Sequence, residues 1–399
     1  MLQLEEARDR ILATIQPLPA ETVPLSDASG RILAEDFVAP LDLPGFDNSA
    51  MDGYAVESDD LKAASGTSPV ALKVVAEIPA GTQPAASISA GTCARIFTGS
   101  PLPAGADAVV MQEDASRTGD TASFHEAVKP WENVRLRGED VKAGTRMLQG
   151  GDRLGIGAIA LLGAMGAGSI RVHRRPVVGV LATGNELQEP GKPLAPGQIY
   201  ESNRTTLAAL IRSVGADARV FPVAPDTLEA TRAALQGALE QCEMVITSGG
   251  VSVGELDFVK EAFQSLGGEL EFWRVAVRPG KPFVFGRWSA GRLFGLPGNP
   301  VSAVVTALLL VAPAILRAQG ARNIEPPSQL AIAADEFRNA TDRRHFMRVC
   351  VDSLGRAHLA GLQASHALAS LAAANALLDV SPGTVIKPGA QVRVIRLGW

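Results

Sequence analysis

Three short loops in the second half of the sequence place glycine, hydroxyl and carboxyl groups directly after apolar runs. They cover residues 183–186, 248–255 and 297–302. If the apolar runs are parallel strands, their carboxyl ends meet at one edge of a sheet, where open α/β sheets bind ligands. Backbone N–H groups in such loops suit a phosphate or another oxyanion. One glycine loop could serve only to form a tight turn, but three at one edge favour a ligand site.

Carboxylates accompany these strand ends. Glu186 and Asp257 lie in or just beyond two of the loops, and Asp226 follows the apolar run between them. Carboxylate oxygens are the hard ligands that Mg²⁺ prefers when it bridges phosphates. Glu186, Asp226 and Asp257 are therefore candidate magnesium ligands.

A cluster of cations follows another apolar run. The segment WRVAVRPGKP contains Arg274, Arg278 and Lys281, and Pro279 and Pro282 stiffen it. Such a cluster can bind an anion through charge-assisted hydrogen bonds. It can equally be a solvated patch of salt bridges, each contributing about 0 to 1 kcal/mol. The segment by itself does not separate these two interpretations.

Other motifs exclude several kinds of chemistry. The sequence contains neither GxxxxGK[ST] nor GxSxG, so neither an ATP-binding P-loop nor a nucleophile elbow is expected. Residues 155–160 match GxGxxA, but a polar segment precedes them, so helix packing is the better interpretation. The five histidines and three cysteines lack metal-ligand spacing, which argues against a zinc site, a histidine-based triad and a disulfide scaffold.

Apolar runs and helical patterns alternate from residue 176 onward, which predicts a doubly wound parallel sheet with right-handed crossovers. The expected strands are 177–182, 218–223, 243–247 and 271–277, with a hairpin through 283–296. The expected helices are 204–213, 227–241, 256–266 and 301–318. Ser202 or Asn203 is expected to cap the first of these helices, and Gly215 to end it.

The remaining regions of the chain show other residue patterns. Residues 38–148 consist of short apolar runs between Gly, Pro, Asp and Ser clusters, which predicts a β-rich region without a convincing helix. Residues 155–168 predict one close-packed helix, and apolar spacing near the N-terminus predicts another. After residue 320, short strands with one Ala-rich stretch near 368–374 predict a small β-barrel-like region.

Composition limits the partners and the location. The 399 residues are 46% hydrophobic and carry a net charge of −5, so a large core is expected and no basic field is available to bind nucleic acid. Residues 301–316 fall short of the roughly 20 residues that span a bilayer, so we expect a buried helix and no membrane span. Dispersed cysteines and acids in place of a basic signal-peptide region fit the cytoplasm.

Eight segments together resemble one known family. They are DNSAMDGYAV (47–56), IFTGSPLPAGADAVVMQED (96–114), RGEDVKAG (137–144), ATGNELQ (182–188), IYESNR (199–204), SGGVSVGELD (248–257), RPGKP (278–282) and GLPGNPVSA (295–303). In this order, and over nearly the whole chain, they resemble the molybdopterin molybdenumtransferases, the MoeA family, which is related to the E domain of gephyrin. The combination is far more specific than any single glycine loop.

The resemblance implies an activity and an architecture. The activity is insertion of molybdenum from molybdate into adenylylated molybdopterin, with release of AMP and assistance from Mg²⁺. The architecture is an elongated homodimer of four-domain subunits. The implied domains are a linking domain (1–44 with 141–174), a β-rich lid (45–140), a molybdopterin-binding α/β domain (175–322) and a C-terminal β-barrel-like domain (323–399). The molybdopterin adenylyltransferase and molybdoenzyme chaperones are candidate protein partners.

The resemblance also assigns site residues by motif. The implied catalytic residues are Asp52, Thr98, Asp140, Glu186, Asp226, Asp257, Arg274 and Arg278, with the lid residues acting across the dimer. The implied cofactor-binding residues are Thr183, Gly184, Ser248, Gly249, Gly250, Ser252, Lys281, Pro297, Pro300, Ser302, Arg348 and Ser365. Of these, Arg278, Lys281, Ser302, Arg348 and Ser365 would form the molybdate pocket.

The sequence departs from the family pattern at three of these places. Arginine stands at 274 and 278, where the family commonly has lysine, and it binds oxyanions as a planar fork. Asn185 replaces a usual aspartate, which removes one possible carboxylate from the metal side.

Two other functions remain open at this point. One is the preceding step, adenylylation of molybdopterin by Mg-ATP, although the loop GGVSVGELD differs from the GGTG-type loop of that enzyme. The other is a non-catalytic scaffold, as in gephyrin-like proteins.

Overall fold

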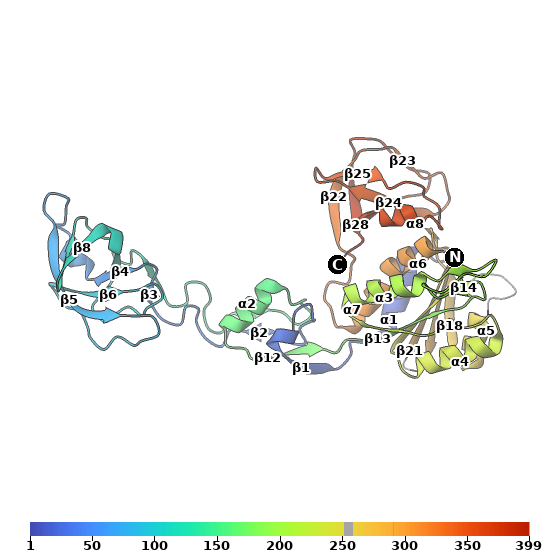
Figure 1. Cartoon of the computed structure of the whole chain (residues 1–399), viewed down its shortest axis with the longest axis horizontal. Coiled ribbons are helices and arrows are strands. Elements are labelled where there is room, and N and C mark those ends of the chain that lie inside the picture. The colour runs from blue at the N-terminus through green and yellow to red at the C-terminus, as the bar shows by residue number, and fades with distance from the viewer. Residues whose placement is uncertain (251–257, 290, 399) are drawn as a thin grey trace. The chain divides into compact units, whose positions relative to one another are not determined.

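The computed structural model describes residues 1–250, 258–289 and 291–398. It divides into two compact units (Figure 1). The first unit comprises Met1–Glu35, Gly150–Gly155 and Ser169–Trp399, and the second comprises Asp36–Gln149 and Ile156–Gly168. The finer division into four domains stays a prediction.

A six-stranded sheet is the centre of the first unit, in the order β16-β13-β17-β21-β20-β18. Its strands are β13 (Val177–Ala182), β16 (Asp217–Val220), β17 (Met244–Ser248), β18 (Glu269–Arg274), β20 (Pro282–Trp288) and β21 (Gly291–Leu296). The strands β16, β13, β17 and β21 are mutually parallel. The strand β20 is antiparallel to both of its neighbours: to β21, to which a hairpin joins it, and to β18. The predicted doubly wound sheet and its hairpin are confirmed.

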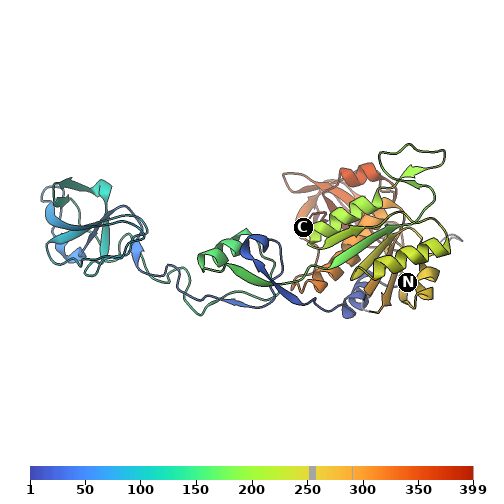
Figure 2. The same cartoon turned by 60° about the horizontal axis from the view of Figure 1, so that its bottom comes forward.

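Helices cover both faces of this sheet (Figure 2). On one face lie α1 (Leu4–Ala13), α3 (Asn203–Val214), α6 (Pro300–Thr306) and α7 (Ala312–Ala318). On the other lie α4 (Leu228–Leu239) and α5 (Val259–Ser265). Alternate strand residues enter the two cores, as the two-residue period of a strand requires: Ile246 and Phe285 pack on one side, Val245 and Val284 on the other. Each fully buried side chain of this kind contributes about 1.5–3 kcal/mol.

The predicted helix 301–318 is continuous but not uniformly α-helical. A π-helical turn (Ala307–Val311) joins α6 to α7. Pro313 lies two residues beyond this turn, and because proline has no N–H it cannot continue the regular hydrogen-bond ladder. Residues 300–318 are long and apolar enough to span a bilayer, but 94% of the most apolar window is buried against the sheet. This segment is the core helix that the sequence predicts.

Two predicted strands end earlier than expected. The predicted strand 218–223 stops at Val220, and Pro222 lies just beyond, where the missing N–H prevents further pairing. The predicted strand 271–277 is two elements: β18 ends at Arg274, and β19 (Val277–Arg278) pairs with a strand of the C-terminal barrel instead. The chain leaves the central sheet there because the Ala276 N–H donates to Leu2 O and the Val275 N–H to Lys281 O.

The C-terminal region is a closed barrel, as predicted. Its five strands are β22 (Ser328–Ala333), β24 (Arg344–Val351), β25 (Arg356–Leu359), β26 (Ala376–Val380) and β28 (Gln391–Arg396). Pairing runs β24-β25-β22-β28-β26 and returns to β24, so no strand of the ring is left with an open edge. The short pair β23 (Phe337–Arg338) and β27 (Val385–Ile386) and the helix α8 (Leu368–Ala372) accompany it. A two-stranded ribbon of β1 (Ala20–Pro24) and β12 (Ser169–His173) completes the first unit.

The second unit is built around a six-stranded sheet in the order β7-β4-β6-β5-β9-β8. Its strands are β4 (Gly53–Val56), β5 (Val70–Ile78), β6 (Thr92–Ile96), β7 (Ala108–Met111), β8 (Ala115–Thr118) and β9 (Thr121–Phe124). Two short pairs join it: β2 (Phe37–Val38) with β11 (Arg146–Leu148), and β3 (Asn48–Ser49) with β10 (Val134–Arg135). Residues 38–148 are described throughout and contain no α-helix, which confirms the β-rich prediction.

The predicted helix within 155–168 exists as α2 (Ile156–Ala164), but the prediction that it is close-packed is wrong. Only Leu162 of this helix is buried, and the Ile156 side chain is 87% exposed. A Cβ atom built on Gly155 or Gly157 would meet nothing within 4 Å. The small apolar residues of α2 therefore leave an exposed apolar face rather than a packed one.

Candidate functional site

The three predicted loops meet at the carboxyl edge of the central sheet. They line one cavity of about 620 Å³. Thr183 and Glu186 come from the loop after β13, Ser248 and Gly249 from the loop after β17, and Gly298 and Asn299 from the loop after β21. The parallel register of β13, β17 and β21 brings these chain segments together, since Ala182 pairs with Ser248 and Ser248 with Leu296.

The second loop needs its glycines. Gly249 and Gly250 have φ values of +92° and +67°, which L-residues rarely adopt. A Cβ atom on Gly250 would lie 2.6 Å from Val259 Cγ2 and 3.0 Å from Thr183 Oγ1. The backbone of this loop therefore packs tightly between the first loop and α5.

Asn203, the first residue of α3, ties two of the loops together. Its Nδ2 donates to Ser248 Oγ and to Gly298 O, both at 2.7 Å. Ser202 occupies the N-cap position of α3, as predicted, although its side chain makes no cap hydrogen bond. The Glu201 carboxylate instead accepts the Arg204 N–H at 2.9 Å. Gly215 does end the helix, with a left-handed φ of +99°.

A buried ion-pair network holds this start of α3. The Arg204 guanidinium donates to Glu201 Oε2 at 2.9 Å, to Glu189 Oε1 at 2.6 Å and to Phe221 O at 2.6 Å. Burial by itself would lower the pKa of Arg204, but the hydrogen bonds to Glu189 and Glu201 outweigh it and raise that pKa. The charge is thus paired within the protein, which fixes the wall of the cavity.

Part of the cavity lining is an apolar wall. It is formed by Leu187 of β14 (Leu187–Gln188), by Ile199 and Tyr200 of β15 (Ile199–Tyr200), and by Leu368 of α8. Tyr200 and Ile199 are about half exposed. A cavity with one apolar and one hydrogen-bonding wall suits a ligand that carries both a ring system and anionic oxygens.

Two of the predicted magnesium ligands lie at the first loop. The Glu186 carboxylate folds over Gly184, where a built Cβ would be 2.7 Å from Glu186 Oε2. Asp226 reaches the same loop: its Oδ2 accepts the Asn185 N–H at 3.0 Å, and its own N–H donates to Asn185 Oδ1 at 3.1 Å. Asp226 Oδ1 has no partner in the described part of the chain, so an oxygen ligand is available there. The donor set fits Mg²⁺ in its chemistry.

The third predicted ligand, Asp257, and the predicted phosphate contact Ser252 lie outside the described residues. Among the residues that are described, no group of three His, Cys, Asp or Glu side chains could hold a metal. The magnesium site therefore stays a prediction.

The predicted cations lie where the chain passes from the central sheet to the C-terminal barrel and back. Arg278 in β19 pairs in register with His345 in β24, and Lys281 follows at the start of β20. Gly280 packs so closely that a Cβ atom would lie 2.4 Å from Thr306 Cγ2 and 3.7 Å from Ser302 O, which places this segment against α6. Across the described ranges, Arg274, Arg278 and Lys281 form no ion pair, so the salt-bridge interpretation is not supported.

Arg348 is the most informative of the predicted residues. Its side chain is completely buried in β24, and burial lowers the pKa of its guanidinium. Nε donates to Ser370 Oγ at 2.7 Å, and Nη2 to Leu362 O at 2.6 Å and to Ala364 O at 3.1 Å. Nη1 is buried with no hydrogen-bond partner in the described structure. A buried cationic donor without an acceptor is costly, so this atom is suited to receive an anion.

His345 adds to this positive region without a charge of its own. The side chain is buried, and neither ring nitrogen has a partner among the described residues. Burial, followed by repulsion from Arg278, Arg348 and Arg343, lowers the pKa of His345 to about 4. At neutral pH it is therefore a neutral imidazole beside three cations.

Two predicted hydroxyl residues lie near the third loop. Ser365 Oγ is 3.1 Å from Asn299 Nδ2, and Ser365 O accepts the Val301 N–H at 3.1 Å. Ser302 is buried in α6. The predicted Pro300 lines the cavity, while the predicted Pro297 is buried and precedes Gly298. The structure thus brings most of the predicted cofactor-binding residues of the first unit to one region.

The predicted lid residues lie in the second unit. Asp52 Oδ1 accepts the Thr98 N–H and the Thr98 hydroxyl, both at 2.8 Å, and these two bonds lower the pKa of Asp52. Asp140 is exposed, and its N–H donates to Leu43 O at 3.1 Å. The structure therefore joins Asp52 to Thr98 by hydrogen bonds, and in the described residues no hydrogen bond joins Asp140 to either of them.

Asn203, Asn299 and Tyr200 line the cavity without having been predicted as site residues. At the start of an amphipathic pattern, an asparagine such as Asn203 predicts a helix cap. Their signal is positional: Asn203 and Tyr200 belong to the segment IYESNR, and Asn299 lies between two prolines of a glycine loop.

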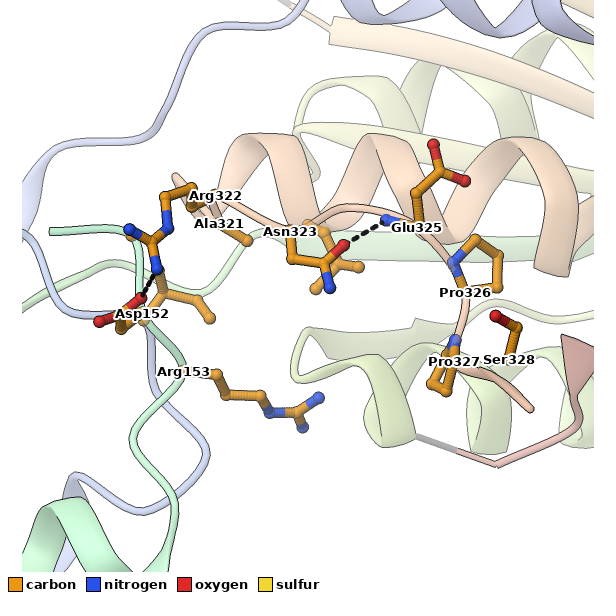
Figure 3. Close-up of a pocket in the computed structure, with 12 residues that line it drawn as sticks. Asp152, Arg153, Ala321, Arg322, Asn323, Glu325, Pro326, Pro327 and Ser328 are labelled. Carbon is orange, nitrogen blue, oxygen red and sulfur yellow. Dashed lines mark hydrogen bonds and ion pairs between the residues drawn. The ribbon is translucent and has the colours of Figure 1, made fainter. Parts of the chain in front are cut away.

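A second cavity, of about 530 Å³, lies away from these strand ends (Figure 3). It forms where residues 151–153 meet the segment that follows α7. Arg322 pairs with Asp152 at 2.8 Å, and Asn323 Oδ1 accepts the Glu325 N–H at 3.2 Å. Gly151 packs there against Arg322, whose N–H donates to Gly151 O at 3.0 Å. These contacts make the second cavity a structural junction.

Comparison with known proteins gives matches over nearly the whole chain. Residues 2–166 match the MoeA N-terminal region (domain I and II), residues 179–317 match a probable molybdopterin binding domain, and residues 331–397 match the MoeA C-terminal region (domain IV).

Full-length relatives agree with these matches. Molybdopterin molybdenumtransferase 2 of Mycobacterium tuberculosis is 40% identical over 380 residues, which cover 94% of each chain. Molybdopterin molybdenumtransferase of Haemophilus influenzae is 39% identical over 386 residues, covering 95% of this chain and 94% of the relative. The crystal structure of a molybdopterin biosynthesis MoeA protein from Pyrococcus horikoshii superposes with a TM-score of 0.85 at 30% identity, covering 99% of this chain and 100% of that one. The chain belongs to the MoeA family of molybdopterin molybdenumtransferases.

Proposed function

We propose that this chain inserts molybdenum from molybdate into adenylylated molybdopterin, releasing AMP and forming molybdenum cofactor. The relatives named above carry this activity in their names, and they match at 39–40% identity over 94–95% of the chain. One structural observation carries the proposal further: Arg348 Nη1 is buried with no acceptor among the described residues, in the same unit as the three loops that line the cavity.

The three loops hold the phosphoryl part of the substrate. Gly249 and Gly250 allow a turn that other residues would strain. The Gly249 N–H already donates to Leu296 O at 3.1 Å, so the Gly250 N–H is the proposed backbone donor to phosphate oxygens. The pterin or adenine ring lies against the apolar wall of Ile199 and Tyr200. Binding in one fixed place supplies most of the rate effect, since proximity converts an encounter into an intramolecular step.

Arg278, Lys281 and Arg348 receive molybdate, a tetrahedral dianion. Its desolvation requires convergent charged donors. Within the described residues, Arg278 and Lys281 form no ion pair and Arg348 Nη1 has no hydrogen-bond partner, so these donors can serve the anion. Hydroxyl groups of Ser302 and Ser365 complete this pocket. No side-chain nucleophile is needed in this scheme.

Mg²⁺ would be held by Glu186, Asp226 and Asp257. When bound, it would offset the charge that develops on the departing AMP phosphate. The chain's own contribution is to hold Asp226 through its two hydrogen bonds with Asn185 and to fold Glu186 over Gly184.

A turnover assay tests the proposed function. Purified chain with adenylylated molybdopterin, molybdate and Mg²⁺ is expected to release AMP in a molybdate-dependent manner. Formation of adenylylated molybdopterin from ATP and molybdopterin would instead favour the preceding step of the pathway. A chain that does neither would be a scaffold.

The metal assignment has its own test. Asp257→Asn is expected to abolish AMP release and leave the mass of the assembly unchanged. Asp217→Asn serves as the matched control, because Asp217 is the first residue of β16 and lies at the end of that strand away from the carboxyl edge of the sheet. Full turnover by Asp257→Asn at saturating Mg²⁺ would contradict the assignment.

We also propose that the chain is a homodimer in which Asp52, Thr98 and Asp140 act on the partner's substrate. Support comes from the family resemblance and from apolar side chains that the second unit leaves exposed, such as Ile156 and Trp131. Light scattering at micromolar concentration should give twice the 41.6 kDa chain mass. We propose a cytoplasmic location and hand-over contacts with the molybdopterin adenylyltransferase and molybdoenzyme chaperones.

A further inference from the structure

The amide of Asn203 has only one orientation that satisfies its neighbours. Its Nδ2 is 2.7 Å from Gly298 O and 2.7 Å from Ser248 Oγ. A carbonyl oxygen can only accept, so the nitrogen rather than the oxygen of the amide must face Gly298. Both amide protons are then used, one for each partner.

This orientation fixes the direction of the Ser248 hydroxyl. Ser248 Oγ accepts from Asn203, so its own proton must point elsewhere. The side chain is only 3% exposed and lines the cavity, and within the described ranges its oxygen contacts no other polar group. A buried hydroxyl whose proton lacks an acceptor is unfavourable, and an acceptor atom of a ligand in the cavity would satisfy it.

We propose that Asn203 is a positioning residue that fixes the Ser248 hydroxyl as a hydrogen-bond donor to an anionic oxygen of the bound ligand. This inference rests on the proposed function for the identity of that oxygen, a phosphoryl oxygen of the adenylylated substrate. The same amide holds Ser248 and Gly298 in register, so the second and third loops present one continuous surface.

The arrangement selects for acceptors. The bond from Asn203 uses one of the two lone pairs of Ser248 Oγ, and a ligand group that can only donate would leave the Ser248 proton without an acceptor. A phosphoryl oxygen accepts that proton in a charge-assisted bond, the stronger class of hydrogen bond. Ser248 therefore contributes through its side chain, in addition to the backbone contact that its loop position implies.

A double-mutant cycle separates this role from a structural one. Asn203→Asp places a carboxylate next to Ser248 Oγ, and that carboxylate would accept the hydroxyl proton and withdraw it from the ligand. Ser248→Ala removes the proton altogether. The added negative charge of Asn203→Asp is present in both backgrounds, so it cancels in the cycle.

AMP and inorganic pyrophosphate, titrated separately by calorimetry, are suitable anionic probes, and adenosine is the uncharged control. Ser248→Ala is expected to weaken binding of at least one anionic probe about tenfold and to leave adenosine unchanged. The effect of Asn203→Asp on that probe should be about tenfold smaller in the Ser248→Ala background than in the natural one. Asn375→Asp is the matched control, since Asn375 makes two backbone hydrogen bonds to Val351 in the barrel.

Equal effects of Asn203→Asp in both backgrounds would overturn the proposal, as would wild-type protein that binds neither anionic probe. If Asn203→Asp does not fold, as judged by its melting curve, the same cycle is run with Asn203→Ala, and additive losses would count against the proposal. The proposed function fails separately: wild-type protein would then release no AMP from adenylylated molybdopterin, whatever the cycle shows.

Discussion

Two regions of the first unit differ in how their polar groups are hydrogen-bonded. The loop cavity is lined by the three loops around Thr183, Ser248 and Gly298, and the cation region comprises Arg278, Lys281, His345 and Arg348. In the loop cavity, Asn203, Glu201 and Arg204 are bonded to protein partners, and one hydroxyl proton is left over. In the cation region, Arg348 Nη1 and both nitrogens of His345 are buried without any partner in the described structure. The polar side chains of the cavity are therefore held in place by hydrogen bonds within the protein, whereas the cation region contains buried nitrogen atoms that would be stabilised by an anion.

This difference separates two tasks that one site has to perform. A preorganised loop surface positions a large substrate without rearrangement. Cations that form no ion pair within the described residues create a positive electrostatic potential, which favours binding of a small dianion that must lose its hydration water. Substitutions should therefore affect shape and stability in the first region, and anion requirement in the second.

The largest effect is expected for Arg348→Lys. The Arg348 guanidinium donates hydrogen bonds to Ser370 Oγ, Leu362 O and Ala364 O and still has Nη1 for an anion. A lysine ammonium keeps the charge but has too few donors to make all of these bonds. We expect the molybdate requirement to rise about 100-fold, equivalent to two charge-assisted hydrogen bonds, with a smaller change for adenylylated molybdopterin. The readout is initial AMP release at varied molybdate.

Arg344→Lys is the control on the same strand, because Arg344 is already paired with Asp379 and Glu5. A rise in molybdate requirement for Arg344→Lys as large as that for Arg348→Lys would remove the distinction between paired and unpaired cations.

Gly250→Ala tests the preorganised loop. The left-handed φ of +67° and the contact at 2.6 Å from Val259 Cγ2 should together destabilise the fold by about 2 kcal/mol. Gly191→Ala has a φ of +90° but open space around the added methyl, so it measures the conformational penalty alone. Denaturant unfolding of both variants gives the difference. Equal losses would mean that the second loop is not tightly packed.

Arg278→Ala tests the second member of the cation region. We expect the molybdate requirement to rise about tenfold, the value of one charge-assisted hydrogen bond, and to rise more than the requirement for adenylylated pterin. Equal increases for the two substrates would argue against a dedicated oxyanion pocket.

The smallest expected effect concerns pH and His345. Burial, then repulsion by Arg278, Arg348 and Arg343, lowers the folded-state pKa from 6.5 to about 4, so the unfolded chain binds more protons between these values. Folding stability should therefore fall as the pH drops from 6.5 toward 4, by about 1–2 kcal/mol at pH 5. His345→Leu should remove this part of the pH dependence in denaturant titrations. An unchanged pH slope in that variant would show that His345 is not held neutral.

The sequence predicts the fold well where residue patterns act locally. The apolar runs that form β13 and β17 and the glycine at the end of α3 are local signals, and the structure confirms the elements they predict. The convergence of three loops also follows from the sequence, because parallel strands bring their carboxyl ends to one edge.

The misses come from partners that lie far away in the sequence. Asn203 is a plausible helix cap until Ser248 and Gly298 are placed beside it. Val277 and Arg278 look like the end of a sheet strand, but they pair with β24 more than 60 residues later. The packing of α2 could not be inferred from its small residues, since close packing needs a neighbour that the chain does not provide there.

Anomalous diffraction from crystals soaked in molybdate, with tungstate as a heavier analogue, tests the central claim most directly. The account predicts one strong peak within hydrogen-bond distance of Arg348 Nη1 and near Arg278, on the barrel side of the loop cavity. A peak elsewhere, or no peak at either side chain in crystals that bind the oxyanion, would contradict it.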